Sequence, residues 1–253
     1  MRIQGKFLNS TLGRRLFFLF CVCSLVPLLL MGALAFTQVK AELKAQAERS
    51  LQQSTKATGM AIYERMILLS SEMERIAAML ENSGPSQVQL WDEIEDMFVT
   101  LVYYRGPGRT AELLPSKRSR PIPIDYAAIS NDPDNISVFI RPGDPVSRLY
   151  LTLPVVKGRF DRGFLVGEIN SSFLWKIGSS NILPPQTEIL VLDQDRNVVL
   201  SSLAHTDTPV SHMPENRENG RSRQFQWTQD GTQYLGRCWN IFMPSRFHSD
   251  SWR

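Results

Sequence analysis

The sequence is poor in cysteine and histidine, with three of each among 253 residues. Cys21 and Cys23 lie inside an apolar run and Cys238 stands alone downstream, so the sequence predicts neither a disulfide framework nor a zinc site. It also lacks a Walker A loop, a Gly-x-Gly-x-x-Gly dinucleotide motif, a Gly-x-Ser-x-Gly elbow and a His-Glu-x-x-His motif. These absences argue against an enzyme, and we predict no catalytic residue and no cofactor.

Two small groups of side chains could instead indicate a metal site or an acid–base pair. His205 and His212 flank Asp207 in a polar loop, which could hold a metal ion, but loop histidines at such spacing are more often solvated. Asp193 and Asp195 resemble paired carboxylates, yet turn propensity explains them more simply. We therefore expect no metal site and no acid–base pair.

The body of the chain has no surplus of positive charge. The net charge is +3, of which the first 15 residues contribute +4, so the remaining residues carry −1. A near-neutral body offers no broad basic surface for phosphate contacts. Nucleic-acid binding is therefore not expected.

Charge is absent altogether from residues 16–39, a run of 24 apolar or uncharged residues. As a helix this run would be about 36 Å long, against about 30 Å for the hydrocarbon core of a bilayer. Membrane helices tolerate a proline such as Pro27. Arg14 and Arg15 precede the run, which predicts that residues 1–15 stay in the cytoplasm and that the body is exported.

A cleaved signal peptide is the alternative reading of this run, because Ala33-Leu34-Ala35 has the small-x-small form of a cleavage site. The apolar core of a signal peptide is usually about 7–15 residues long, shorter than the run here. We therefore predict an uncleaved, single-pass anchor in the inner (cytoplasmic) membrane, with the body in the periplasm.

Residues 40–82 are rich in helix formers and predict one long helix that follows the membrane span. Apolar residues spaced alternately four and three apart form an unbroken seam: Ile62, Met66, Leu69, Met73, Ile76 and Leu80. Ile67 and Leu68 widen this apolar face, so we expect the seam to pack within its own chain.

The first part of the same helix has a thinner apolar stripe, formed by Leu43, Ala47 and Leu51. Residues 40–60 are too polar to lie against a domain core, yet an isolated helix of this length is marginal in water. Pairing with the same stripe of a second copy would bury it. We therefore predict a homodimer through the long helix.

The rest of the chain predicts an α+β body with antiparallel sheets. A shorter helix is expected over residues 87–99, and a short helix over 173–177 after Asn170. Strands are expected over residues 136–141, 148–156, 164–169, 187–192, 198–201, 224–229 and 232–241. Asp230-Gly231 is the strongest hairpin signal, and Pro184-Pro185 marks a boundary between two halves.

This order of parts resembles the extracytoplasmic sensor region of bacterial membrane receptors of the double Cache (PAS-like) type. The resembling segments are Gly163 to Asn170, Phe173 to Trp175, Glu188 to Asp193, Val198 to Ser202 and Asp230 to Leu235, followed by Trp239, Phe242, Phe247 and Trp252. The resemblance implies a parallel dimer, two Cache halves and a diguanylate cyclase or histidine kinase as the output module.

The sequence departs from that family at its end and in one motif. In such receptors a final strand, a second membrane helix and an output domain follow the counterpart of Trp252, whereas this sequence ends at Arg253. We therefore expect a truncated receptor or an interrupted reading frame, with the second half incomplete. The amino-acid-binding motif of some double Cache domains is not matched, so no binding residue is transferred from it.

The resulting prediction is a membrane-anchored sensor that binds a small ligand and transmits a conformational change, without a catalytic output domain. Its expected parts are a tail (1–15), a transmembrane helix (16–39), a long helix (40–82), a membrane-distal Cache domain (83–183) and an incomplete membrane-proximal half (184–253). The alternative is a single-pass envelope adaptor that binds another protein, and an anchored hydrolase is least supported.

Candidate ligand contacts follow from chemistry alone. An anionic or zwitterionic ligand needs a cation and aromatic walls. Arg141, Arg148 and Tyr150 lie on the first predicted hairpin, and Tyr103 and Tyr104 lie on the segment before it. These five residues are the predicted ligand-binding residues, against the simpler reading that the arginines are solvated edge-strand residues.

Overall fold

The computed structural model describes the greater part of the chain. Described residues are 11–83, 94–105, 110–114, 122, 136–141, 147–157, 159–175, 187–193, 195–203, 207–213, 223–241, 243 and 247–248. The Pro184-Pro185 boundary, His205, Phe242 and Trp252 lie outside the described residues. Contacts divide the chain into two units, Met1–Ser50 and Leu51–Arg253, and the first helix contributes to both.

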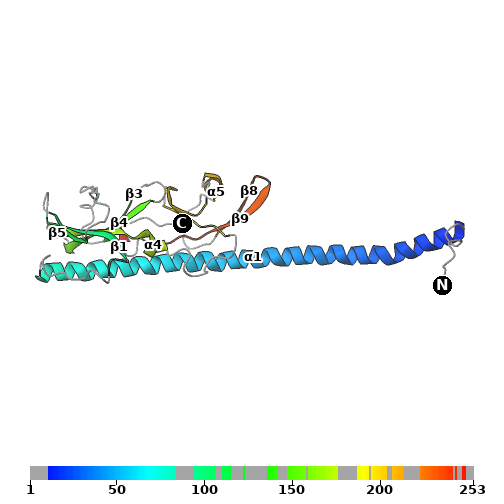
Figure 1. Cartoon of the computed structure of the whole chain (residues 1–253), viewed down its shortest axis with the longest axis horizontal. Helices are drawn as coiled ribbons and strands as arrows, with labels where there is room; N and C mark the ends of the chain where they lie inside the picture. The colour runs from blue at the N-terminus through cyan, green and yellow to red at the C-terminus, as the bar shows by residue number, and fades with distance from the viewer. Residues whose placement is uncertain are drawn as a thin grey trace. The chain divides into compact units, whose positions relative to one another are not determined.

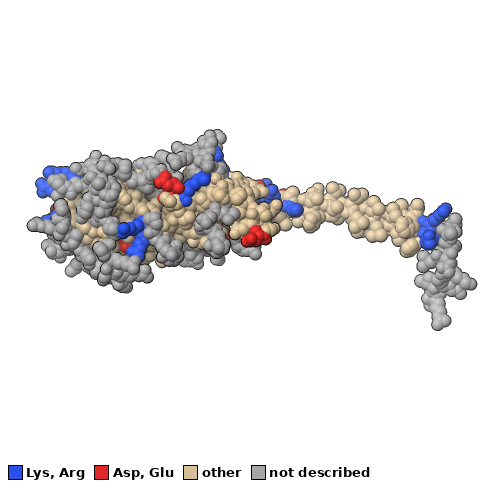
Figure 2. Space-filling model, turned by 90° about the horizontal axis from the view of Figure 1, so that it is seen from above, with Lys and Arg blue, Asp and Glu red and all other residues tan. Residues whose placement is uncertain are grey.

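Helix α1 (Thr11–Ser83) is one continuous helix that includes Pro27 (Figure 1). Among the described residues it is the one helix long and apolar enough to cross a membrane. Every side chain of residues 16–39 except that of Cys21 is exposed. Figure 2 shows this stretch as a part of the helix without blue or red side chains, as its lack of charged residues requires.

The main sheet has six strands in the order β10-β3-β4-β5-β1-β2. The strands are β1 (Phe98–Tyr104), β2 (Thr110–Leu114), β3 (Ile136–Arg141), β4 (Arg148–Val156), β5 (Arg159–Ile169) and β10 (Phe247–His248). All neighbours are antiparallel except β10, which pairs with β3 in parallel. The predicted strands over 136–141 and 148–156 are confirmed with these bounds.

One expected element is wrong in part. The helix predicted over residues 87–99 does not reach its expected end, because Phe98 and Val99 begin strand β1. The strand reads FVTLVYY and buries six of its seven side chains. Such a mostly apolar run, interrupted only by Thr100, is typical of a strand covered on both faces. Its spacing of apolar residues also fits the end of a helix.

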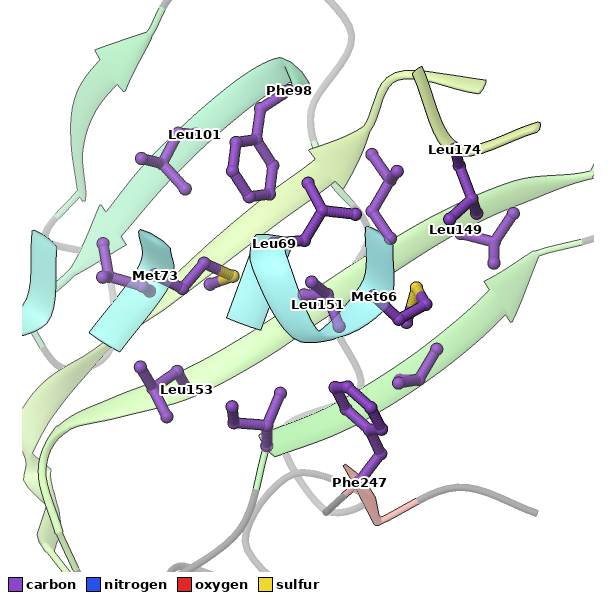
Figure 3. Close-up of a cluster of buried hydrophobic side chains, with 14 of the residues drawn as sticks. Met66, Leu69, Met73, Phe98, Leu101, Leu149, Leu151, Leu153, Leu174 and Phe247 are labelled. Carbon is purple, nitrogen blue, oxygen red and sulfur yellow. The ribbon is translucent and has the colours of Figure 1, made fainter. Parts of the chain in front are cut away.

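The seam of α1 packs within its own chain, as predicted, and it lies against one face of the six-stranded sheet. Ile62, Met66, Leu69, Met73, Ile76 and Leu80 are all buried. They join one core cluster with sheet residues that include Leu101, Leu149, Leu151 and Leu165. Figure 3 shows Met66, Leu69 and Met73 against the strands. Phe247 of the edge strand β10 lies beside β3.

The remaining elements form smaller pieces. Helix α4 (Ser171–Trp175) follows β5. Strand β6 (Leu190–Leu192) pairs with β7 (Val198–Ser201). Helix α5 (Asp207–His212) precedes the hairpin of β8 (Arg223–Gln229) and β9 (Thr232–Cys238). Each hairpin is a two-stranded sheet. The predicted Asp230-Gly231 turn is confirmed, and both residues have positive φ, 51° and 76°, as a type I′ turn requires.

Candidate functional site

The face of the six-stranded sheet that does not pack on α1 is called here the outer face. Because side chains alternate along a strand, every second residue of β1, β4 and β5 points to it. The outer face carries a second buried apolar cluster, distinct from the α1 core: Val102, Tyr104, Tyr150, Phe164 and Val166, with Phe139 and Ile122 packed against it. Tyr104 and Phe164 are stacked, with ring centroids 5.0 Å apart.

Polar side chains share the outer face with this aromatic cluster. The strand register places Thr100, Glu168, Tyr150 and Phe139 side by side across β1, β5, β4 and β3. The next row contains Thr152 and Ser137, which are both buried. The outer face therefore combines aromatic walls with a few buried polar groups, which is the usual composition of a small-molecule site.

Charged groups lie at one end of the outer face. Nη1 of Arg148 is 3.6 Å from Oε1 of Glu168, whose side chain is 15% exposed. Arg141 pairs directly with Arg148 across the β3–β4 ladder, so the two guanidinium groups lie on the same face. Two cations and one carboxylate therefore border Tyr150.

The pKa of Tyr150 reflects this environment. Burial raises the pKa of the phenol above its ordinary value of 10.0, and the negative charge of Glu168 raises it further. Arg148, by a hydrogen bond and its charge, and Arg141, by its charge, act in the opposite direction. At neutral pH Tyr150 is therefore a neutral hydroxyl that can donate or accept a hydrogen bond.

The structure places four of the five predicted ligand-binding residues on the same face of the sheet. Tyr104, Arg141, Arg148 and Tyr150 all belong to the outer face. Tyr103 belongs to the α1 core instead, and its hydroxyl donates a hydrogen bond of 3.3 Å to the backbone carbonyl of Arg162. Because neighbouring residues of a strand point to opposite faces, Tyr103 and Tyr104 cannot line the same face.

Glu168 and Phe164 were not among the residues predicted from the sequence, although both contact predicted ones. Glu168 stands in the otherwise apolar stretch FLVGEI of β5. A carboxylate in a strand with buried neighbours is rarely there without a partner. Because residues 164–169 were predicted as a strand, this isolated carboxylate was a signal that could have identified Glu168.

Two residues beyond Glu168, the chain connects the outer face to α1. Asn170 caps α4 by accepting a hydrogen bond from the backbone N–H of Ser172, at 3.0 Å. Nη1 of Arg65, on α1, donates hydrogen bonds of 2.8 and 3.1 Å to the carbonyls of Leu174 and Trp175 at the other end of α4. The short helix is thus held between the sheet and the long helix.

Two of the other candidate residues from the sequence, Asp193 and His212, make local contacts. The carboxylate of Asp193 accepts hydrogen bonds from the backbone and side-chain N–H groups of Asn197, each 2.8 Å, within the β6–β7 turn. Ser211 and His212 form a local contact of 3.1 Å in α5. In the part of the chain that the structure describes, no group of three or more His, Cys, Asp or Glu residues could hold a metal ion.

No protein-family model matches the chain, and no curated protein matches its sequence. Solved structures do match its fold. The ligand-binding domain of Campylobacter jejuni chemoreceptor Tlp3 in complex with L-valine has a TM-score of 0.51 at 15% identity, covering 80% of this chain and 92% of that one. The same domain with L-norvaline has a TM-score of 0.53 at 14% identity, covering 79% and 89%.

A third match is the ligand-binding domain of Pseudomonas aeruginosa PAO1 amino acid chemoreceptor PctB in complex with L-Arg. Its TM-score is 0.52 at 12% identity, and the match covers 82% of this chain and 93% of that one. Identities this low show the fold alone. The chain therefore has the α+β fold of chemoreceptor sensory domains, in which a long N-terminal helix precedes an antiparallel-sheet body.

Proposed function

We propose that this chain is the sensor module of a membrane receptor of the double Cache type, and that it binds a small molecule on the outer face. The observation that carries this proposal is the placement of two aromatic and three charged side chains on one sheet face: Tyr104, Tyr150, Arg141, Arg148 and Glu168. The fold supports it, since the similar solved structures are ligand-binding domains in complex with amino acids.

Ligand binding would be transmitted through β5. A molecule that contacts Glu168 acts two residues from Asn170, the cap of α4. Arg65 of α1 is hydrogen-bonded to the other end of α4. A displacement of β5 therefore moves the carbonyl groups of α4 to which this arginine donates. The ligand shifts the equilibrium between two packings of α1 to the extent that it binds one of them better.

The proposed domains keep the boundaries expected from the sequence. Residues 83–183 form the membrane-distal half, to which most of the six-stranded sheet belongs, and residues 184–253 form the membrane-proximal half. β10 belongs to the second half by sequence and to the first half by pairing, because it lies beside β3. The two halves are therefore coupled through the sheet as well as through α1.

In this proposal residues 16–39 anchor the receptor in the inner membrane, with residues 1–15 in the cytoplasm and the body in the periplasm. The exposed apolar side chains of that stretch and the flanking Arg14 and Arg15 support the assignment. Intact-mass measurement of the membrane-extracted protein tests it. A mature chain that begins at Phe36 would show that the segment is a cleaved signal peptide.

The proposed oligomer is a parallel homodimer through the apolar stripe of residues 40–60. The expectation that this whole range is too polar to pack on the body is wrong at Gly59, which is buried against Trp239. Leu43 is 60% exposed, although it lies in the apolar stripe with Ala47 and Leu51. A second copy offers the same stripe, and a shared membrane anchor raises the effective concentration of the two helices. The dimer gives the receptor a helix pair whose packing can change.

A thermal-shift screen of the full chain in detergent micelles tests the sensor function. Amino acids, organic acids and amines are the compound classes to include, because the outer face presents both signs of charge and aromatic walls. At least one compound is expected to raise the melting temperature, by mass action on the folded state. The absence of any shift across the three classes would contradict the sensor function.

A second candidate function is an envelope adaptor that binds another protein, and the β8–β9 hairpin favours it. Trp227 stacks between Phe225 and Tyr234, with centroid distances of 5.5 and 5.1 Å, and Tyr234 is 42% exposed. Partly exposed aromatic rows of this kind occur at protein interfaces. An adaptor would show no melting shift with small molecules but would lose its partner when Trp227 and Tyr234 are replaced by serine.

A further inference from the structure

The outer face contains a like-charged pair that the fold itself does not need. Arg141 and Arg148 are direct cross-strand partners in the β3–β4 ladder. Like charges placed directly opposite each other destabilise a pair of strands. An anionic group bound between the two guanidinium groups would remove that cost and accept hydrogen bonds from both.

Glu168 neutralises only part of this charge. Its carboxylate is 3.6 Å from Arg148, and both groups act on Tyr150, as Arg141 does. The described charged groups around the Tyr150 hydroxyl are therefore two cations and one anion, an excess of one positive charge. Arg141 is the exposed member of the three, so its charge is the one that a ligand can reach.

The same charges oppose a second, positive group on the ligand. An ammonium group near Arg141 and Arg148 would be repelled by both. To pair with the ammonium, the mostly buried carboxylate of Glu168 would have to release Arg148. A zwitterion thus gains less at this end of the outer face than a simple anion does.

We propose that the ligand of this site is a monocarboxylate with an apolar or aromatic body and no ammonium group. The carboxylate lies between Arg141 and Arg148, and the body extends past Tyr150 toward the stacked rings of Tyr104 and Phe164. This proposal rests on the proposed function and specifies the ligand of that same site. The proposed ligand differs from those of the similar solved structures, which are complexes with amino acids.

Three matched compounds test the proposal: 3-phenylpropanoate, L-phenylalanine and 2-phenylethylamine, which share one body and differ only in the carboxylate and the amino group. Their dissociation constants are measured by calorimetry on the full chain in detergent micelles. We expect 3-phenylpropanoate to bind at least about tenfold more tightly than L-phenylalanine, the scale of one charge-assisted interaction. We expect no binding of 2-phenylethylamine. The pair 4-methylpentanoate and L-leucine repeats the comparison with an aliphatic body.

Two variants connect the preference to the arginine pair. Arg141→Gln should weaken carboxylate binding by about tenfold or more, because it removes one charged donor. Lys157→Gln removes the same charge from the turn at the opposite end of β4 and should leave the affinity unchanged. Without ligand, Arg141→Gln should melt at or above the wild-type temperature, since the repulsion with Arg148 is gone.

Several results would overturn the proposal. They are binding of L-phenylalanine as tight as that of 3-phenylpropanoate, an unchanged affinity in Arg141→Gln, or a lower melting temperature of that variant without ligand. If neither carboxylate binds but another compound from the screen does, the proposal fails and the sensor function stands. If no compound binds the wild-type chain, both fail.

Discussion

Arg148 on β4 forms an ion pair with Glu168 on β5, with 3.6 Å between Nη1 and Oε1. The carboxylate is the more buried partner, with 15% of its side chain exposed against 32% for the arginine. A partly exposed pair at this separation contributes about 1 kcal/mol or less to stability. The importance of the pair therefore lies in the charge that it places beside Tyr150, at the charged end of the outer face.

The first prediction concerns the stability of the folded chain at high pH. Because burial and Glu168 raise the pKa of Tyr150, the folded state holds the phenol proton more tightly than the unfolded state does. The resulting stability is fully present below the unfolded pKa of about 10 and is lost as pH rises through the raised pKa. The melting temperature of the wild type should therefore fall more steeply above pH 10 than that of Tyr150→Phe.

Glu168→Gln is the companion variant in this measurement. It removes one cause of the raised pKa of Tyr150, so the loss of stability at high pH should shrink. All other residues are identical in the three proteins, so the comparison cancels their contributions. Identical pH profiles for the wild type and Tyr150→Phe would contradict this account of the outer face.

A second prediction concerns the attachment of α4 to α1. Arg65→Met removes two hydrogen bonds from a charged donor to the carbonyls of Leu174 and Trp175 and should cost about 1.5–3 kcal/mol. Arg75→Met is the matched control on the same helix. Arg75 pairs with Glu72 one turn away, a contact that contributes about 0.5 kcal/mol or less.

Thermal unfolding of both variants in detergent, with and without a compound from the screen, provides the measurement. Arg65→Met should also reduce any effect of that compound on crosslinking within residues 40–60. Equal costs for the two variants would mean that Arg65 is an ordinary surface residue.

A third prediction concerns Gly59, where α1 meets Trp239. A Cβ atom at Gly59 would lie 2.8 Å from Cδ1 of the indole, and Nζ of Lys56 lies 5.7 Å from the same ring. Replacing glycine by alanine inside a helix normally stabilises it by about 1 kcal/mol. Here Gly59→Ala should give no gain, or a loss, because the indole has to move.

The matched control is the same substitution in a Trp239→Ala background, where the steric conflict is absent and the gain of about 1 kcal/mol should return. Unfolding followed by tryptophan fluorescence measures both. A gain of similar size in the two backgrounds would show that the contact between Gly59 and Trp239 does not constrain α1.

A fourth prediction concerns the homodimer. Single cysteines at Leu43, Ala47 and Leu51, in a background without Cys21, Cys23 and Cys238, should crosslink efficiently in membranes. Cysteines at Lys44 and Glu48 serve as controls, because they lie off the apolar stripe, and should crosslink poorly. Uniformly absent crosslinking would indicate a monomer and remove the proposed helix pair.

The sequence predicted those elements whose pattern has only one reading. The α1 seam from Ile62 to Leu80 repeats at helical spacing, and it is buried throughout. The Asp230-Gly231 turn requires positive φ at both positions, and few other residue pairs accept that conformation. In both cases the local sequence was sufficient to predict the structure.

Other features depended on contacts far apart in the sequence. The run from Phe98 to Tyr104 fits a helix end or a buried strand by spacing alone, and pairing with β5 decides the matter. The parallel pairing of Phe247 with Ile136 has no local signal. For the site, alternation separates Tyr103 from Tyr104 only once β1 is known to be a strand.

Hydrogen exchange of the full chain in lipid nanodiscs, with and without a compound found by the screen, tests the central claim most directly. The account predicts slower exchange in β1, β4 and β5, together with a change in α4 and in residues 51–83 of α1. In the Tyr150→Ala variant this protection should be lost at the same compound concentration. Protection confined to the β8–β9 hairpin, or protection of β4 and β5 that persists in Tyr150→Ala, would contradict the outer face as the binding site.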